Sequence, residues 1–379
     1  MAKKERKTSA PKSASSGAGG KATQAKLRKL DSQILGLIND RARVAAELQT
    51  GREREMLTES FLVEEASLLD RLEEVNEGPL DGEAVRAVFR EILGGCRSLG
   101  GRLRVAMLGP WFSYSHLAAI ERFGSTADFL PVGNIAAVFE EVQRGHANYG
   151  IVPIENSTDG RVIDTLDMFT QMSVRICGEV ELAIHHMLLG IGGRDEIREV
   201  QSKPQALSQC RNWLARHLPQ AVLKEVTSTS AAAAAAKESP HIAAIASRQA
   251  GNAHGLKILA ENIEDNSGNI TRFSVIATQS APRTGKDKTA IIFQLDHRPG
   301  TLAEALNLFK RNRINLTWIE SLPIPNSDRA YLFFVELEGH ETDLKIRRVV
   351  QLLENKALQL KILGSYPSLF PAAGRRLES

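Results

Sequence analysis

Hydroxyl and amide side chains recur in the middle of this 379-residue chain, next to short apolar runs and in front of helices. Serine and threonine in front of a helix are commonly N-caps, which accept hydrogen bonds from free backbone N–H groups. The same helix N-termini attract anions. Several of them facing one cleft would suit a small dicarboxylate. The segments are residues 109–116, 153–158, 202–205 with Gln209, 228–230 and 269–273.

The signatures of common cofactor sites are missing from this region. It contains no GxGxxG, GxxxxGK[ST], HExxH or CxxC sequence. Cys96, Cys177 and Cys210 are far apart and odd in number, which fits neither a metal site nor a disulfide framework. We therefore expect three buried thiols.

Alternating strands and helices must position these polar segments. Residues 103–108, 149–154 and 241–246 read as strands, and 115–123, 135–144 and 230–237 as helices. This alternation predicts parallel sheet with helices on both faces. Residues 103–279 are enough for two lobes with a ligand cleft between them.

The regions on either side have their own patterns. Residues 22–100 show three amphipathic helices, and Leu27, Leu30, Ile34, Leu37 and Val44 form the first stripe. Three helices make a thin core, so we expect dimerisation through the stripes. Residues 288–367 follow the βαββαβ order of a ferredoxin-like domain. A basic tail (1–21) and a short C-terminal tail (368–379) are predicted to be flexible.

Composition excludes several classes of protein. Net charge is only +3, and no aromatic residues interleave the N-terminal lysines, which argues against nucleic-acid binding. Neither a signal peptide nor an apolar run long enough for a bilayer is evident. The sequence therefore predicts a cytoplasmic protein that binds neither membrane nor nucleic acid.

The polar segments, taken in order, resemble prephenate dehydratase. That family's GP-x-G-[ST]-[FY]-S-H, P-I-E-N-[ST], S-x-P-Q, S-T-[AS]-A and T-R-F elements are matched over residues 103–280. Phe112 departs from the pattern, because the family has glycine there. The resemblance implies a two-lobed, periplasmic-binding-protein-like catalytic domain within a multidomain α/β chain. It also implies loss of carbon dioxide and water from prephenate to give phenylpyruvate, without a cofactor.

Carried over residue by residue, the resemblance gives Thr271 the role of a hydrogen-bonding partner for the leaving hydroxyl. Asn156, Gln209 and Ser202 join it as catalytic candidates, and Glu155 is a candidate acid if burial raises its pKa.

The remaining site candidates are expected to bind substrate. Arg272 could clamp a carboxylate or form a structural ion pair. His186 lies in an apolar run, where a hydrogen-bonded core histidine is favoured over a base. The other candidates are Ser113, Gln205, Thr229 and Ser230.

The C-terminal region resembles an ACT regulatory domain. Gly300, Thr301 and Leu302 match the turn into its first helix, while Glu320 and Ser321 match its E-S-R-P element. This implies phenylalanine as an effector. Leu322 replaces the family arginine, which predicts a weaker response.

The N-terminal helices resemble the all-helical chorismate mutase, with Arg41, Arg52 and Glu65 at matching positions. Arg41 and Glu65 lie on apolar stripes, so they form either a structural pair or part of a pocket for chorismate. Glu64 stands where the family has arginine, which would repel a dianion. We expect weak or no mutase activity and a mainly dimerising role.

Two other classes of protein are weighed against this hypothesis. A non-catalytic two-lobed effector-binding protein shares the predicted fold. An amino-acid-responsive transcription regulator is disfavoured, because no helix-turn-helix is evident.

Overall fold

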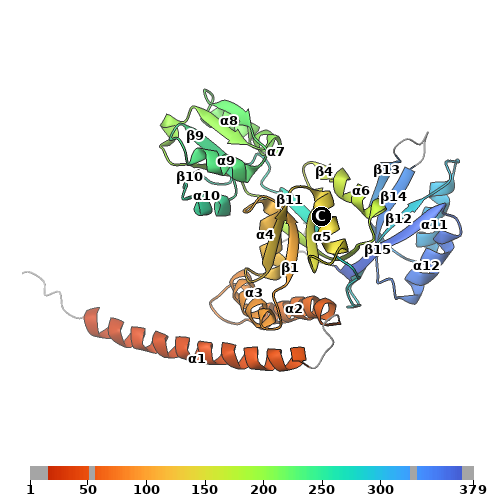
Figure 1. Ribbon diagram of the computed structural model, residues 1–379, viewed down its shortest axis with the longest axis horizontal. Helices are drawn as coiled ribbons and strands as arrows, with labels where there is room; N and C mark the ends of the chain where they lie inside the picture. The colour runs from red at the N-terminus through yellow and green to blue at the C-terminus, as the bar shows by residue number, and fades with distance from the viewer. Residues whose placement is uncertain (1–15, 51–55, 325–330, 369–379) are drawn as a thin grey trace, which may run out of the picture.

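The computed structural model describes residues 16–50, 56–324 and 331–368. It divides into a helical segment, two α/β lobes and a C-terminal unit (Figure 1). Arg52, one of the mutase candidates, lies outside the described residues.

The helical segment consists of α1 (Ser16–Thr50), α2 (Met56–Glu74) and α3 (Gly82–Ser98). The first helix begins six residues before the predicted boundary at residue 22. Its predicted stripe of Leu27, Leu30, Ile34, Leu37 and Val44 is 44% to 69% exposed. Figure 1 shows α1 projecting from the body, so a single chain leaves this stripe uncovered. Among the described helices, none is both long and apolar enough to cross a membrane.

The first lobe is built on a mixed sheet of strand order β2-β1-β3-β11-β5, with β4 paired to β3. Strands β1, β2 and β3 are parallel, but β11 runs antiparallel to both β3 and β5. The predicted parallel sheet is therefore present in part, because β11 returns from the second lobe in the opposite direction. The elements are β1 (Arg104–Leu108), α4 (Tyr114–Phe123), β2 (Asp128–Val132), α5 (Ile135–Gln143), β3 (Tyr149–Asn156), β4 (Gly160–Arg161), α6 (Ile163–Gln171), β5 (Arg175–Ala183) and β11 (Ile270–Ala277).

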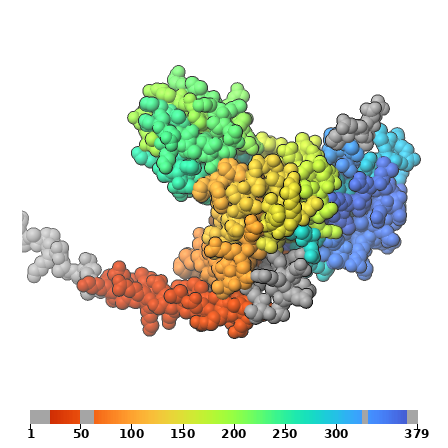
Figure 2. Space-filling model, in the orientation of Figure 1, coloured from red at the N-terminus to blue at the C-terminus, as the bar shows by residue number. Residues whose placement is uncertain are grey.

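The second lobe lies between β5 and β11 in sequence, so the chain passes between the lobes twice. Its sheet has the order β10-β6-β9-β7-β8 and is also mixed. Figure 2 shows this lobe (green) projecting from the first (orange to yellow). The elements are β6 (Met187–Gly190), a 3-10 turn (Arg194–Glu196), β7 (Glu199–Ser202), α7 (Pro204–Gln209), α8 (Arg211–His217), β8 (Val222–Glu225), α9 (Thr229–Ala236), β9 (Ile242–Ala246), α10 (Arg248–His254) and β10 (Lys257–Ala260).

The C-terminal unit has the predicted βαββαβ order. Its four-stranded sheet, ordered β13-β14-β12-β15, is covered on one face by both helices. The elements are β12 (Asp287–Gln294), α11 (Thr301–Arg311), β13 (Leu316–Pro323), β14 (Tyr331–Glu338), α12 (Leu344–Glu354) and β15 (Gln359–Pro367).

The opposite face of this sheet packs on the first lobe. Along β12, Ile291 and Phe293 are buried under the helices, whereas Ala290 and Ile292 join the core of the first lobe. Leu322 of β13 is buried in the same shared core. Alternate side chains of a strand point to opposite faces, so one strand serves two cores. The C-terminal unit and the first lobe therefore share one hydrophobic core.

Candidate active site

Asn156 and Thr271 face each other on the paired strands β3 and β11. Asn156 Nδ2 lies 2.8 Å from Thr271 Oγ1, and the asparagine is 7% exposed. The two residues are 115 positions apart in sequence. Sheet pairing therefore brings together two of the catalytic candidates, which lie in separate motifs of the sequence.

The orientation of the Asn156 amide is fixed by backbone groups. Its Oδ1 accepts hydrogen bonds from Thr158 N at 2.9 Å and Asp159 N at 3.0 Å. A backbone N–H can only donate, so the oxygen must face the turn and the NH₂ must face Thr271. Thr271 Oγ1 is consequently an acceptor toward Asn156, and its own hydrogen remains for another partner.

A closed ring of hydrogen bonds joins this pair to the second lobe. Asn156 Nδ2 also donates to Asn269 Oδ1 at 2.9 Å, and Asn269 Nδ2 donates to Gln209 Oε1 at 3.1 Å. Gln209 Nε2 donates to Asp159 Oδ2 at 3.0 Å, and the Asp159 N–H returns to Asn156. Gln205 also donates to Asp159. Since Gln205 and Gln209 belong to α7, the ring spans the two lobes.

His186 contacts the ring of hydrogen bonds through Gln209. Its Nε2 lies 2.9 Å from Gln209 Oε1, and its Nδ1 lies 3.0 Å from the Tyr114 hydroxyl. Its backbone N–H donates to Glu264 at 2.9 Å. Burial lowers the pKa of His186, which is 2% exposed. The expected hydrogen-bonded core histidine is confirmed, and it holds Gln209 in place.

The candidate hydroxyls are used mainly by the backbone. Ser113 caps α4 by accepting from His116 N and donates to the Leu108 carbonyl at 3.0 Å. Ser202 donates to the Ile245 carbonyl at 2.6 Å, and Ser230 to the Trp111 carbonyl at 2.8 Å. Thr229 begins α9 and is 9% exposed. The predicted capping role is therefore present at Ser113, while Ser230 ties α9 to the first lobe.

Phe112 stands where the family pattern has glycine, and it adopts a backbone conformation that glycine favours. Its φ is 64°, the left-handed conformation that favours glycine and costs other residues about 1–2 kcal/mol. Its ring packs against the second-lobe core and lies 6.4 Å from the His254 ring. Ser247 Oγ also donates to the Phe112 carbonyl at 3.3 Å. The residue therefore contributes a contact between the lobes while its backbone remains in the turn.

Glu155 and Arg272 do not join the Asn156–Thr271 pair. Each is next to a pair member along its strand, so its side chain points to the opposite face. Arg272 contacts Glu155 at 3.2 Å, Glu179 at 3.2 Å and Glu336 at 2.7 Å. Of the two alternatives for Arg272, the structural ion pair is the one present in the structure. The Glu155 side chain is 39% exposed and pairs with Arg272.

The effector candidates occupy two separate segments of the C-terminal unit. Gly300 precedes α11 with φ 88°, and the Thr301 hydroxyl donates to the Asp296 carbonyl at 2.9 Å. Leu302 packs at the edge of the helix-covered core. On β13, Glu320 pairs with Arg161 of the first lobe at 2.5 Å, whereas Ser321 is exposed.

The mutase candidates are arranged differently from the predicted Arg41–Glu65 pair. Glu65 is 8% exposed and pairs with Arg97 of α3 at 2.5 Å. Burial raises the pKa of Glu65 even though Arg97, Arg122 and Arg41 oppose the shift. Arg41 acts on Glu65 through its charge, and the direct pairing belongs to Arg97, because α3 packs closely on α2.

Sequence reasoning missed Asp159 as a site residue and left Asn269 without a role. No local signal marks Asp159, because its side-chain partners Gln205 and Gln209 are 46 and 50 residues away in sequence. The described residues contain no group of three or more His, Cys, Asp or Glu side chains that could hold a metal. Two hollows, of about 340 and 320 Å³, border the C-terminal unit rather than the cleft.

Comparison with known proteins decides the family. The prephenate dehydratase profile matches residues 105–281, and the chorismate mutase type II profile matches residues 24–100. A bifunctional chorismate mutase/prephenate dehydratase of Stutzerimonas stutzeri is 42% identical over 355 residues, covering 92% of this chain and 97% of the relative. The chain belongs to the bifunctional chorismate mutase/prephenate dehydratase family. The Escherichia coli bifunctional enzyme is 31% identical over 371 residues, covering 92% and 96%.

Solved structures share the two-lobed dehydratase fold. A prephenate dehydratase from Arthrobacter aurescens in complex with L-Phe superposes with a TM-score of 0.66 and 31% identity. It covers 70% of this chain and 90% of that chain. The prephenate dehydratase from Staphylococcus aureus gives 0.62 and 31%, covering 70% and 100%. Asn156 and Thr271 both lie within the residues that the prephenate dehydratase profile matches.

Proposed function

We propose that this chain is a prephenate dehydratase that converts prephenate into phenylpyruvate, carbon dioxide and water. The observation that carries the proposal is the Thr271 hydroxyl, which accepts from Asn156 and keeps its own hydrogen for a ligand. Family membership supplies the reaction and substrate.

The bond changes in this reaction define what the site must do. The bond from the ring to its carboxylate breaks, and its electron pair completes the aromatic ring. As this electron pair enters the ring, the C–O bond at the opposite ring carbon breaks in the same step, and the hydroxyl leaves with the electrons of that bond and takes up a proton from water. Negative charge grows on that oxygen, so a hydrogen bond from Thr271 stabilises the transition state more than the ground state.

The carboxylate and keto-acid groups need separate binding positions. The N-termini of α4 and α9 present Ser113, Thr229 and Ser230. Ser202 and Gln205 lie at the end of β7 and the start of α7. Helix N-termini favour anions through their free N–H groups, which supports substrate binding between the lobes.

The C-terminal unit is proposed to be an ACT regulatory domain spanning residues 288–367, with phenylalanine as its effector. The relative solved with L-Phe supports this choice. Gly300, Thr301 and Leu302 would contact one side of the bound phenylalanine. Glu320 and Ser321 would contact its other side. Leu322 is buried against the first lobe, so it supplies no cation to an amino acid, and the response should be weaker than with arginine.

The chorismate mutase type II profile matches residues 24–100 of the helical segment. We propose that this segment mainly forms a homodimer through the exposed stripe of α1, with weak or no turnover of chorismate. The Glu65–Arg97 pair supports this, because it uses the carboxylate that a mutase pocket would need.

Turnover assays with purified full-length protein test the proposal. Prephenate and chorismate are supplied separately, and phenylpyruvate is followed by its ultraviolet absorbance in base. We expect robust formation of phenylpyruvate from prephenate. Binding of prephenate without turnover would instead favour a non-catalytic effector-binding protein.

A further inference from the structure

Strand β11 presents two consecutive side chains to two different parts of the molecule. Thr271 faces Asn156 in the cleft, and Arg272 faces the C-terminal unit. Both residues sit in continuous register with β3 and β5, so the backbone between them is held from both sides. A movement of the Arg272 backbone therefore also moves Thr271.

The C-terminal unit contacts Arg272 from two strands. Glu336 of β14 accepts from Arg272 at 2.7 Å, and the Trp318 ring of β13 lies 4.7 Å from the guanidinium carbon. The Arg272 and Glu336 side chains are only 11% and 2% exposed. A buried, charge-assisted hydrogen bond combined with ring stacking is a strong and directional contact.

Neighbouring groups keep this contact in one arrangement. The Tyr366 hydroxyl donates to the other oxygen of Glu336 at 2.7 Å. Lys288 of β12 pairs with Glu179, the second buried carboxylate that contacts Arg272, at 2.9 Å. The charged pairs thus link β11 and β5 of the first lobe to β12 and β14 of the C-terminal unit, and the Trp318 ring adds β13.

A hollow beside the contact gives Arg272 space to move. It has a volume of about 320 Å³ and is bordered by Glu155, Arg272, Trp318 and Glu336. If the C-terminal sheet shifts, the guanidinium can follow it into this space instead of being blocked by close packing.

We propose that Arg272 is a positioning residue of the dehydratase reaction, through which the C-terminal sheet sets the placement of Thr271. Glu336 and Trp318 hold the guanidinium, the guanidinium holds β11, and β11 places the Thr271 hydroxyl at the leaving group. This goes beyond the structural ion pair and rests on the proposed dehydratase function. An effector that moves the C-terminal sheet would act on turnover by this route.

The test is Glu336→Gln in the full-length protein. Glutamine keeps the shape and the Tyr366 hydrogen bond, and Arg272 retains Glu179 and Glu155, so the variant should fold. We expect kcat for prephenate to fall about tenfold, because displacements near 1 Å can cost up to a hundredfold. KM should stay within about twofold, since substrate binding groups are untouched.

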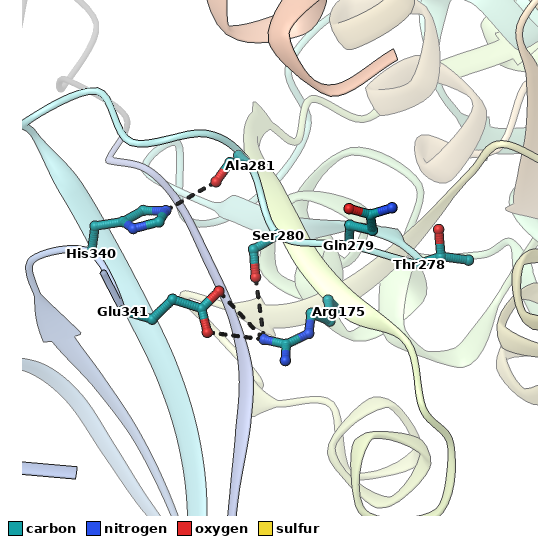
Figure 3. Close-up of a pocket in the computed structure, with 7 residues that line it drawn as sticks. All are labelled: Arg175, Thr278, Gln279, Ser280, Ala281, His340 and Glu341. Carbon is teal, nitrogen blue, oxygen red and sulfur yellow. Dashed lines mark hydrogen bonds and ion pairs between the residues drawn. The ribbon is translucent and has the colours of Figure 1, made fainter. Parts of the chain in front are cut away.

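A matched control removes another ion pair between the same two units. Glu341 accepts from Arg175 at 3.0 Å beside Ser280 (Figure 3), where the far end of β11 pairs with β5 through Ala277 and Arg175. Glu341→Gln should leave kcat within about twofold of wild type, because the affected end of the strand is remote from Thr271. Equal losses in both variants would mean general docking of the units and would overturn the proposal.

A double-mutant cycle shows whether Glu336 acts through Thr271. In a Thr271→Ala background, Glu336→Gln should lower kcat no further, because the hydroxyl it places is gone. Additive losses, or unchanged kcat in Glu336→Gln alone, would overturn the proposal. If Glu336→Gln does not fold, Trp318→Leu is taken through the same cycle and judged by the same outcomes.

Wild-type turnover is measured first, which separates the two proposals. Wild-type protein without phenylpyruvate formation would contradict the proposed function. Active wild-type protein with an unaffected Glu336→Gln variant would contradict only the role of Arg272.

Discussion

Asn156 donates a 2.8 Å hydrogen bond to the Thr271 hydroxyl across strands β3 and β11. The backbone N–H groups of Thr158 and Asp159 fix the direction of this bond by binding the other end of the amide. The Thr271 hydroxyl is thereby prepared as a donor before any substrate arrives. Such preorganisation avoids reorganisation during the reaction and is a major source of catalysis.

Thr271→Ala should lower kcat for prephenate on the order of a hundredfold, because it removes a hydrogen bond to the leaving oxygen. Thr271→Ser is the matched control, since it keeps the hydroxyl and should retain most of the activity. Steady-state kinetics on both variants measure this. A kcat near that of wild type in Thr271→Ala would exclude the assigned role.

Asp159→Ala should raise KM for prephenate about three- to tenfold, a loss of roughly 1 kcal/mol of binding. The change removes the acceptor shared by Gln205 and Gln209, and so opens the ring between the lobes. Asp164→Ala, at an exposed position on the neighbouring helix α6, is the control. Equal KM values for the two variants would show that the ring does not assist binding.

Gly300→Ala should weaken phenylalanine binding about fivefold, because a left-handed backbone costs alanine about 1 kcal/mol and the turn must relax. Gly300 has φ 88°, and Gly285, with φ 93°, provides a matched position in the linker. Both have open space where a Cβ would stand. Calorimetry should show full affinity in Gly285→Ala. The same affinity in both variants would place the sensor elsewhere.

Chorismate should be consumed slowly or not at all by the purified protein. Glu65 is paired with Arg97, and Glu64 stands where a cation is expected, so a dianionic substrate meets unfavourable charge. Disappearance of chorismate, followed with and without Arg41→Ala, measures this. Robust turnover that the substitution abolishes would refute the prediction and assign a working pocket to the helices.

Protein stability should fall as pH rises through the raised pKa of Glu65. Burial favours the neutral acid of Glu65 in the folded state. The stabilisation that neutral Glu65 contributes to folding is therefore present below its ordinary pKa of 4.5 and is lost as the pH rises above its folded pKa. Glu65→Gln should remove this part of the pH dependence in urea unfolding. Glu74→Gln, at an exposed position of the same helix, should leave it unchanged. A pH dependence that persists in Glu65→Gln would contradict the assignment.

The full-length chain is the right subject for all of these assays. Deleting the residues after Ser280 would remove Leu322, Phe334 and Leu363 from the core shared with the first lobe. That exposes apolar surface on the dehydratase part, at a cost of about 25 cal/mol for each Å². Loss of phenylalanine binding in such a truncation would then not separate sensing from folding.

The order of elements and the identity of the central pair were determined by the sequence alone. Strand and helix periods are local, so the six elements of the C-terminal unit could be predicted within a few residues. Asn156 and Thr271 could be chosen because each lies in a short motif. Phe112 was recognised as a departure, although its left-handed φ was not.

Only the tertiary structure decided which neighbours share a face and which distant residues meet. Glu155 and Arg272 stand next to the central pair in sequence, yet strand alternation sends them toward the C-terminal unit. The ring through Asp159, Asn269 and Gln209 joins the turn after β3 and the residue before β11 to helix α7 of the second lobe. Local propensity cannot predict such contacts, because they depend on strand pairing and lobe packing between residues far apart along the chain.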